Sequence, residues 1–287
     1  MKIITDIAEM RRFVAQAKAA GKTVGLVATL GGMHEGHLSL IDAARADCDV
    51  VVVSIFLNPT QFGPSEDLAA YPRTPEADHA ACDSRGVDVV FAPSVKTIYG
   101  GDSLTEIRVR KLSETLCGRS RPIHFTGVCT VVAKLFNIIP AHKAYFGAKD
   151  YQQSVVIRRM VADLNAPIEI VVCPTVREGD GLALSTRNKY LSADERGQAA
   201  ELYGALSMAA EMIRSSRPPA ADVIAAIGRH LAERAPLGEI DYVQTVDPDD
   251  LTDVQDTDGP LVIALAVRFG GTRLIDNMRV DAPAQAN

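Results

Sequence analysis

The sequence lacks any apolar run that approaches the roughly 18 residues of a membrane-spanning helix. Its first residues, Met-Lys-Ile-Ile-Thr-Asp, also lack the apolar core and the small-residue cleavage site of a secretory signal peptide. The cysteines number five, an odd count, and no two of them form a Cys-x-x-Cys pair. Neither a disulfide framework nor a zinc site is therefore indicated. These absences predict a cytoplasmic protein with no membrane partner and no dedicated metal site.

The sequence also has no excess of basic residues, because its formal net charge is -6. That balance argues against a general nucleic-acid-binding surface, although it leaves room for a local cationic pocket. The hydrophobic content of 47% and the charged content of 23% are those of a globular protein with a sizeable core. A length of 287 residues corresponds to one large domain or two smaller ones.

The most informative stretch runs from Val24 to His37 and reads Val-Gly-Leu-Val-Ala-Thr-Leu-Gly-Gly-Met-His-Glu-Gly-His. Its first five residues are apolar and predict a buried strand. Glycines then break the strand, and helical spacing begins at Gly36. A strand followed by a glycine turn and a helix places backbone N–H groups and the positive end of a helix dipole where an anion can bind.

His34 and His37 stand three residues apart at the start of that helix, so they lie on one side of a helical turn. Two imidazoles there can donate hydrogen bonds to phosphate oxygens. A metal site is the less favoured interpretation, because no third or fourth ligand is nearby. Two solvated loop histidines are the alternative if the motif is taken alone.

The order of predicted elements favours an α/β fold with a Rossmann-like parallel sheet, covered by helices, over residues 1–176. The β-branched run at 49–56 is typical of a strand buried on both faces. A smaller α+β domain is expected over residues 177–287. The predicted helices cover 5–20, 36–47, 75–85, 127–139, 193–215 and 220–234. The predicted strands cover 24–28, 49–56, 87–91, 107–110, 144–146, 168–173, 240–247, 261–269 and 273–277.

Four further loops carry candidate binding groups. Gln61 follows the second predicted strand, and its amide suits a substrate with hydroxyl and carboxylate groups. Lys149 stands at a helix start, where it can bind a phosphate, and Asp150 can cap the helix or bond a ribose hydroxyl. The Ser-Thr-Arg segment ending at Arg187 can wrap a polyphosphate. The loop at 116–127 holds two arginines suited to anions.

Several long stretches, in the same order, make the chain resemble the pantothenate synthetase (pantoate–β-alanine ligase) family. That family belongs to the nucleotidyltransferase superfamily with the His-x-Gly-His signature. The matching stretches are Thr29–His37, Val53–Phe62, Tyr71–Thr74, Phe91–Ser94, Tyr145–Gln153, Asp180–Asn188 and Arg273–Asn277. The chain departs from the usual family pattern at Ala28, Leu30 and Thr186.

The resemblance implies ATP-dependent condensation of (R)-pantoate with β-alanine through a pantoyl adenylate, releasing AMP and pyrophosphate. It implies a homodimer, a second domain acting as a lid, and Mg²⁺ carried by the ATP phosphates. By carry-over, His37, His34, Lys149 and Arg187 are catalytic. ATP would bind at Leu30, Gly31, Gly32, Met33, His34, Glu35, Gly36, His37, Gly147, Ala148, Lys149, Asp150, Val176, Leu184, Ser185, Thr186 and Arg187. Pantoate would bind at Gln61 and Gln153, and β-alanine at Gln61.

Two alternatives stay open from the sequence. An adenylyltransferase acting on a phosphorylated acceptor would need extra cations for that acceptor and no amine site. A catalytically inactive nucleotide sensor would keep the fold without turnover. Two glutamines, Gln61 and Gln153, favour an unphosphorylated hydroxy acid over the first alternative.

Overall fold

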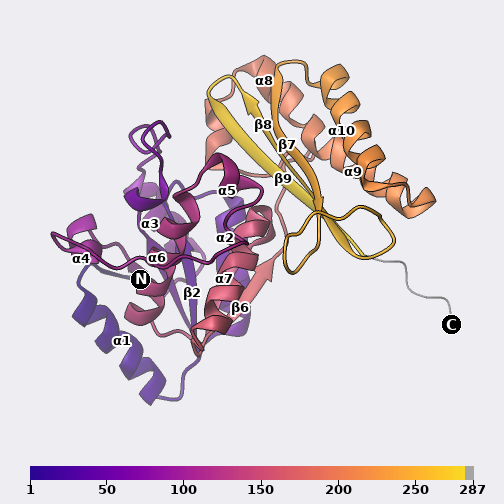
Figure 1. Cartoon of the computed structure of the whole chain (residues 1–287). Coiled ribbons are helices and arrows are strands. Elements are labelled where there is room, and N and C mark those ends of the chain that lie inside the picture. The colour runs from indigo at the N-terminus through magenta and orange to yellow at the C-terminus, as the bar shows by residue number, and fades with distance from the viewer. Residues whose placement is uncertain (282–287) are drawn as a thin grey trace. The chain divides into compact units, whose positions relative to one another are not determined.

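The computed structural model describes residues 1–281, and residues 282–287 at the end of the predicted second domain lie outside the described part. The chain divides into two compact units, whose elements are labelled in Figure 1. The main boundary between the two units in the sequence lies between Thr175 and Val176. Two short segments from the first half of the chain, Thr115–Ser120 and Lys149–Gln152, nevertheless belong to the second unit.

The first unit is built on a six-stranded parallel sheet with the order β1-β4-β3-β2-β5-β6. Its strands are β1 (Lys2–Ile4), β2 (Val24–Thr29), β3 (Val50–Ile55), β4 (Val89–Phe91), β5 (Lys143–Gly147) and β6 (Glu169–Cys173). Because the central strands are buried on both faces, they consist of continuous apolar runs. The strand order reverses between β2 and β5, and open α/β sheets bind ligands beside the carboxyl ends of the strands at such a point.

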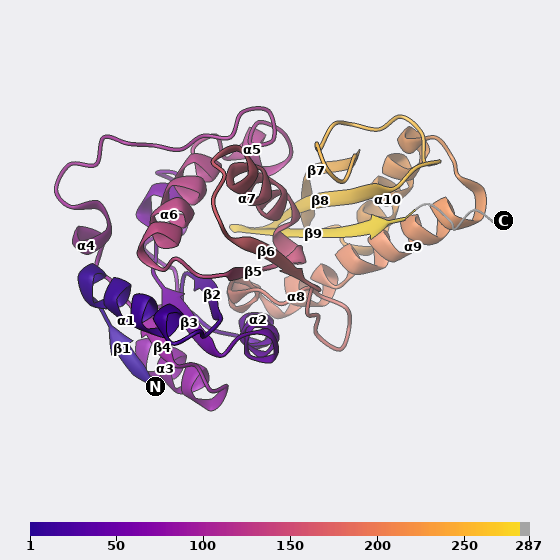
Figure 2. The same ribbon diagram turned by 90° about the horizontal axis from the view of Figure 1, so that it is seen from below.

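Helices cover both faces of this sheet, as Figure 2 shows. They are α1 (Ile7–Ala19), α2 (Glu35–Asp47), α3 (Pro75–Ser84), α4 (Val95–Tyr99), α6 (His124–Ile138) and α7 (Tyr151–Asp163), with the 3₁₀ turn η1 (Pro59–Gln61). Helices α2 and α3 share one apolar cluster with β2 and β3, to which Ile41, Val53 and Cys82 contribute. Helices α1 and α6 lie together on the opposite face.

The second unit contains an antiparallel sheet with the order β7-β8-β9. Its strands and longer helices are β7 (Gly238–Val246), β8 (Leu261–Phe269), β9 (Thr272–Val280), α8 (Ala193–Ala199), α9 (Glu201–Ser216) and α10 (Ala220–Arg234). The unit also includes the 3₁₀ turn η3 (Thr186–Tyr190), the short helix α5 (Cys117–Ser120), and residues 149–150 of the 3₁₀ turn η2 (Ala148–Asp150). Figure 1 shows α9 and α10 against one face of this sheet, where Leu206, Ile227 and Ile263 form part of its core.

These two sheets confirm the predicted fold class, a Rossmann-like parallel sheet followed by a smaller α+β part. The predicted helix over 220–234 matches α10 in full. A predicted strand at 107–110 is wrong, because this segment pairs with no other strand. Instead the backbone N–H of Ile107 donates to the hydroxyl of Thr130 on α6 at 2.9 Å. The predicted helix over 193–215 is interrupted at Ala200.

All five cysteines are buried and unpaired. Burial raises the pKa of the Cys82 thiol to about 11, and the carboxylate of Asp78 acts in the same direction. Burial also raises the pKa of Cys129 to about 12. Cys82 and Cys129 therefore pack as small apolar side chains. Over residues 1–281, no helix combines the length and the apolarity that a bilayer crossing requires.

Candidate active site

Three loops that carry predicted site residues leave the carboxyl ends of neighbouring strands in the first unit. The segment from Leu30 to His37 follows β2, Gln61 lies in η1 after β3, and Gly147 ends β5 directly before Ala148. Strand β2 pairs with both β3 and β5 in parallel, so the three strands end at the same edge of the sheet. This edge includes the point where the strand order reverses, between β2 and β5.

The two histidines of the motif lie at the start of α2. His34 is the N-cap residue, and its Nδ1 accepts a hydrogen bond from the backbone N–H of Gly36 at 3.1 Å. An accepting Nδ1 requires a neutral ring whose proton is on Nε2, so His34 can offer a donor from its other nitrogen. The ring centroids of His34 and His37 lie 4.0 Å apart, with an angle of 31° between the planes.

A buried carboxylate that the sequence analysis missed fixes the glycine turn before these histidines. Asp78 of α3 is only 3% exposed, and it accepts the backbone N–H groups of Gly32 at 3.0 Å and of Met33 at 2.8 Å. Gly31 and Gly32 have φ values of 90° and 64°, which glycine adopts without strain. Because these N–H groups bind Asp78, the groups in this segment that are suited to contact an anion are the imidazole side chains and the positive end of the α2 dipole.

Gln61 is held in a defined orientation by a second missed residue, Asn58. The Asn58 amide nitrogen donates to Gln61 Oε1 at 3.1 Å, while Asn58 Oδ1 accepts from the Tyr99 hydroxyl at 2.7 Å. Asn58 is fully buried, so its own amide orientation is fixed by these bonds together. Since Gln61 Oε1 already accepts a hydrogen bond, its Nε2 is the group that can donate to a substrate oxygen.

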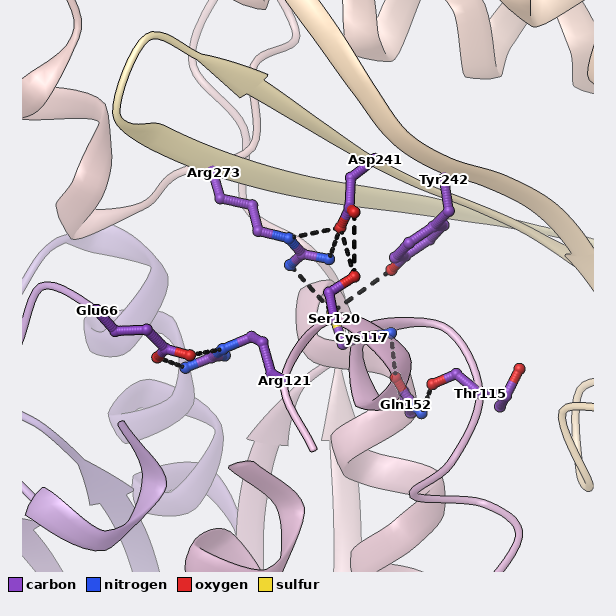
Figure 3. A network of polar contacts seen from close by, with 9 residues as sticks. All are labelled: Glu66, Thr115, Cys117, Ser120, Arg121, Gln152, Asp241, Tyr242 and Arg273. Atoms are coloured by element: carbon purple, nitrogen blue, oxygen red, sulfur yellow. Dashed lines mark hydrogen bonds and ion pairs between the residues drawn. The ribbon is translucent and has the colours of Figure 1, made fainter. Parts of the chain in front are cut away.

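Arg121 has a protein partner where the sequence suggested an anionic ligand. Its guanidinium binds the carboxylate of Glu66 through two nitrogens, as Figure 3 shows, and it also donates to the Gln61 carbonyl at 3.4 Å. His124 Nδ1 lies 2.9 Å from the same carbonyl. Burial alone would raise the pKa of Glu66, but the hydrogen bond and charge of Arg121 outweigh it and lower that pKa. The ion pair thus stabilises this loop at neutral pH, and protonation of Glu66 at acid pH removes that stabilisation.

Gly127 of α6 lets η1 approach the helix closely. A Cβ atom at this position would overlap the Thr60 carbonyl and lie 2.6 Å from the backbone nitrogen of Gln61. The Gly127 carbonyl also accepts from the Asn58 side chain at 3.2 Å. The position of Gln61 therefore depends on the absence of a side chain at residue 127.

We expect Gly127→Ala to destabilise the protein by about 1–3 kcal/mol, the usual cost of overpacking, and to raise the KM for any substrate that Gln61 contacts. Urea unfolding and steady-state kinetics measure the two effects. Gly228→Ala is the matched control, because Gly228 is also inside a helix but has no atom within 4 Å of the position that a Cβ would occupy. That control should gain roughly 0.5–1 kcal/mol. Equal stability changes in the two variants would contradict the packing argument.

The remaining predicted site residues lie mainly in the second unit. Lys149 and Asp150 belong to η2, and Val176 starts the main part of the unit. Gln153 lies in α7 and belongs to the first unit. The Leu184–Arg187 segment leads into η3, whose N-cap Ser185 accepts the backbone N–H of Arg187 at 3.2 Å.

A short hairpin, residues 176–184, carries the Ser-Thr-Arg segment. Its two arms meet at an antiparallel bridge between Arg177 and Ala183, and the backbone N–H of Leu184 donates to the Val176 carbonyl at 3.0 Å. The Asn188 amide closes the far end by donating to the Ala183 carbonyl at 3.1 Å. The backbone of the Ser-Thr-Arg segment is thus anchored on both sides.

Comparison with known proteins gives one consistent result. The sequence model of the family "Pantoate-beta-alanine ligase" matches residues 2–279. A pantothenate synthetase of Moorella thermoacetica is 51% identical over 97% of this chain and 98% of that protein. A pantothenate synthetase of Thermotoga neapolitana is 50% identical over 96% of this chain and 99% of that protein.

Solved structures agree over the same length. The crystal structure of pantothenate synthetase from Thermus thermophilus has a TM-score of 0.92 and 42% identity, covering 98% of this chain and 100% of that one. A pantoate-beta-alanine ligase from Francisella tularensis, complexed with beta-gamma ATP and beta-alanine, has a TM-score of 0.79 and 34% identity, covering 97% of each chain. The resemblance inferred from the sequence motifs is confirmed, and the chain belongs to the pantoate–β-alanine ligase family.

Proposed function

We propose that this chain, as a pantoate–β-alanine ligase, joins pantoate to β-alanine in two steps through a pantoyl adenylate. In the first step a carboxylate oxygen of pantoate attacks the α-phosphorus of ATP, and the bond to the bridging oxygen breaks as pyrophosphate leaves. In the second step the β-alanine amine attacks the activated carbonyl carbon, and AMP leaves with the former carboxylate oxygen while the amine loses a proton. The observation that carries this proposal is the His34–His37 pair at the start of α2, beside the reversal point of the sheet.

The first step needs charge stabilisation more than it needs a base. Pantoate is already ionised at neutral pH, whereas negative charge develops on the bridging oxygen and the leaving pyrophosphate. We assign His37 and His34 to hydrogen bonding of the phosphates, with proton donation by His37 as a secondary role. Lys149 and Arg187 supply positive charge for the pyrophosphate.

The other ATP contacts are proposed from the family motifs and their places in the fold. In the first unit they are Leu30, Gly31, Gly32, Met33, Glu35, Gly36, Gly147 and Ala148. In the second unit they are Asp150, Val176, Leu184, Ser185 and Thr186. Mg²⁺ enters with the ATP phosphates, whose oxygens are its preferred ligands. The Francisella tularensis relative, solved with beta-gamma ATP and beta-alanine, supports these two ligands for the family.

Pantoate is assigned to Gln61 and Gln153, and β-alanine to a position near Gln61. The Asn58 bond to Gln61 Oε1 directs a Gln61 donor toward the substrate, and a carboxylate or hydroxyl oxygen can accept it. The two glutamines are neutral, whereas a phosphorylated acceptor would call for cations, and this difference favours the ligase over the adenylyltransferase alternative. Pantoate-dependent exchange of pyrophosphate into ATP, in the absence of β-alanine, separates both the adenylyltransferase and the inactive sensor from the ligase.

Compartment and assembly are further parts of the proposal. Five unpaired buried thiols suit a reducing compartment, and we place the protein in the cytoplasm. We also propose a homodimer, with the second unit serving as the lid of the active site. Sedimentation velocity measures the oligomeric state, and a monomer at micromolar concentration would contradict the dimer.

Isotope transfer tests the proposed chemistry directly. Pantoate labelled with ¹⁸O in its carboxylate is incubated with ATP and β-alanine, and the AMP product is analysed by mass spectrometry. We expect one ¹⁸O atom per AMP, because the attacking oxygen stays on phosphorus when the amide forms. AMP without label, formed during turnover, would exclude an acyl adenylate.

A further inference from the structure

Strand β9 contains two adjacent polar residues, Asp276 and Asn277, within the Arg273–Asn277 motif that the proposed chemistry does not use. Successive side chains of a strand point to opposite faces of the sheet. Asp276 is 3% exposed and lies on the same face as the core residue Leu274. Asn277 and Arg273 therefore lie on the other face. Each of the two faces holds a different segment of the second unit.

Asp276 binds the hairpin that leads to the Ser-Thr-Arg segment. Its carboxylate accepts two hydrogen bonds from Arg177, at 2.6 and 2.9 Å. Arg177 in turn donates to the Gly181 carbonyl at 3.0 Å, and its guanidinium lies 4.1 Å from the ring centroid of Tyr203. The bidentate pair fixes one arm of the hairpin, and the other arm continues directly into residues 184–187.

Asn277 binds the segment that carries Lys149. Its amide nitrogen donates to the backbone carbonyl of Lys149 at 2.8 Å. The same segment is attached again two residues later, where the Tyr151 hydroxyl donates to the Pro248 carbonyl at 2.9 Å. A bond to the carbonyl leaves the Lys149 ammonium for a ligand while it restricts the backbone from which that side chain extends.

The face of β9 that carries Arg273 and Asn277 also anchors α5, which belongs to the second unit. Arg273 binds the carboxylate of Asp241 and lies 3.2 Å from the sulfur of Cys117, and Figure 3 shows this cluster. The Gln152 side chain accepts the backbone N–H of Cys117 at 3.0 Å. The segments at 115–120 and 149–152 are thus bonded to each other as well as to the sheet.

We propose that Asp276 and Asn277 are positioning residues that fix Lys149 and the Ser185–Arg187 segment relative to each other for ATP binding. Their side chains bond the two segments from neighbouring positions of one strand, and the Asn277 N–H bonds the Asp276 carboxylate at 2.8 Å. This inference rests on the proposed ATP contacts of Lys149 and Arg187.

A double-mutant cycle on the full-length protein tests the role of Asn277. The dissociation constant of ATP is measured by calorimetry for wild type, Asn277→Ala, Lys149→Ala and the double variant. We expect Asn277→Ala to weaken ATP binding about tenfold in the wild-type background and less than twofold in the Lys149→Ala background. A positioning residue loses its effect once the side chain that it positions is absent.

Asn277→Leu is a second variant of similar size without a donor, and it replaces Asn277→Ala if that protein does not fold. Glu239→Ala is the control on the same sheet, because Glu239 lies in β7, is exposed, and takes no part in the bonds that hold the Lys149 segment. The control should bind ATP as wild type does. Equal weakening by the Asn277 variant in both backgrounds, or no weakening in the wild-type background, would overturn the positioning role.

The cycle is independent of the proposed reaction, because it measures binding alone. One possible outcome is that labelled pantoate gives unlabelled AMP while the Asn277 effect still depends on Lys149. That outcome would exclude the acyl adenylate but would support the positioning role of Asn277. Additive effects in a protein that transfers ¹⁸O to AMP would remove only the positioning role.

Discussion

His37→Ala is expected to slow pantoyl adenylate formation by about a hundredfold or more, the scale of losing one donor that stabilises developing charge. The residue lies at the positive end of α2, with its ring 4.0 Å from that of His34. Its effect should therefore appear in the phosphoryl-transfer step and not in amide formation. Rapid-quench measurement of pyrophosphate release in a single turnover, without β-alanine, isolates that step.

Two further variants define the role of His37. His37→Gln keeps a neutral donor, so partial recovery of the rate would favour hydrogen bonding over proton donation. His230→Ala is the control, because His230 lies in α10 and pairs with Glu201 at 2.8 Å. It should react at the wild-type rate. A near-wild-type single-turnover rate in His37→Ala would remove the residue from the mechanism.

Lys149→Ala is expected to produce a loss of similar size, about a hundredfold or more in adenylate formation, because it removes a fixed positive charge from the leaving pyrophosphate. The loss should be larger in the rate than in ATP affinity, since charge increases on the pyrophosphate as its bond breaks. The rate at saturating ATP in the same pyrophosphate-release assay measures this difference.

Lys189→Ala is the control for Lys149→Ala, because Lys189 is an exposed lysine in η3 and carries no proposed role. Lys149→Arg keeps the charge but changes its shape and hydration, so we expect partial activity. If Lys149→Ala changed only the KM for ATP, the residue would bind the ground state without assisting the reaction.

Long apolar runs and continuous helical periodicity were sufficient to predict the main elements. The β2 and β3 strands and the α10 helix have such patterns, and each forms where the sequence places it. The three-residue strand β1 has too short a pattern to stand out. The alternation at 107–110 is real, since Val109 is buried, but its residues pack without a neighbouring strand. Ala200 interrupts a helix with neither glycine nor proline to mark the break.

Sequence patterns likewise predicted one part of the candidate site and missed another. Motifs of consecutive residues, such as Gly31 to His37, identify the family and the loops that carry its groups. The residues that hold those loops come from far along the chain: Asp78 lies 46 residues after Gly32, and Asp276 lies 99 residues after Arg177. Such pairs depend on tertiary packing, which local sequence patterns do not encode.

Residues 115–120 and 149–152 belong to the second unit, and this affects any attempt to divide the protein into two fragments. Cleavage at the Thr175–Val176 junction would not separate two self-sufficient pieces. An N-terminal fragment would retain α5 and η2 without Arg273 and Asn277, and a C-terminal fragment would keep those side chains without the Cys117 sulfur and the Lys149 carbonyl that they contact. We expect the two halves to reassociate when they are supplied together as separate polypeptides. The N-terminal half carries residues 115–120 and 149–152, which belong to the second unit.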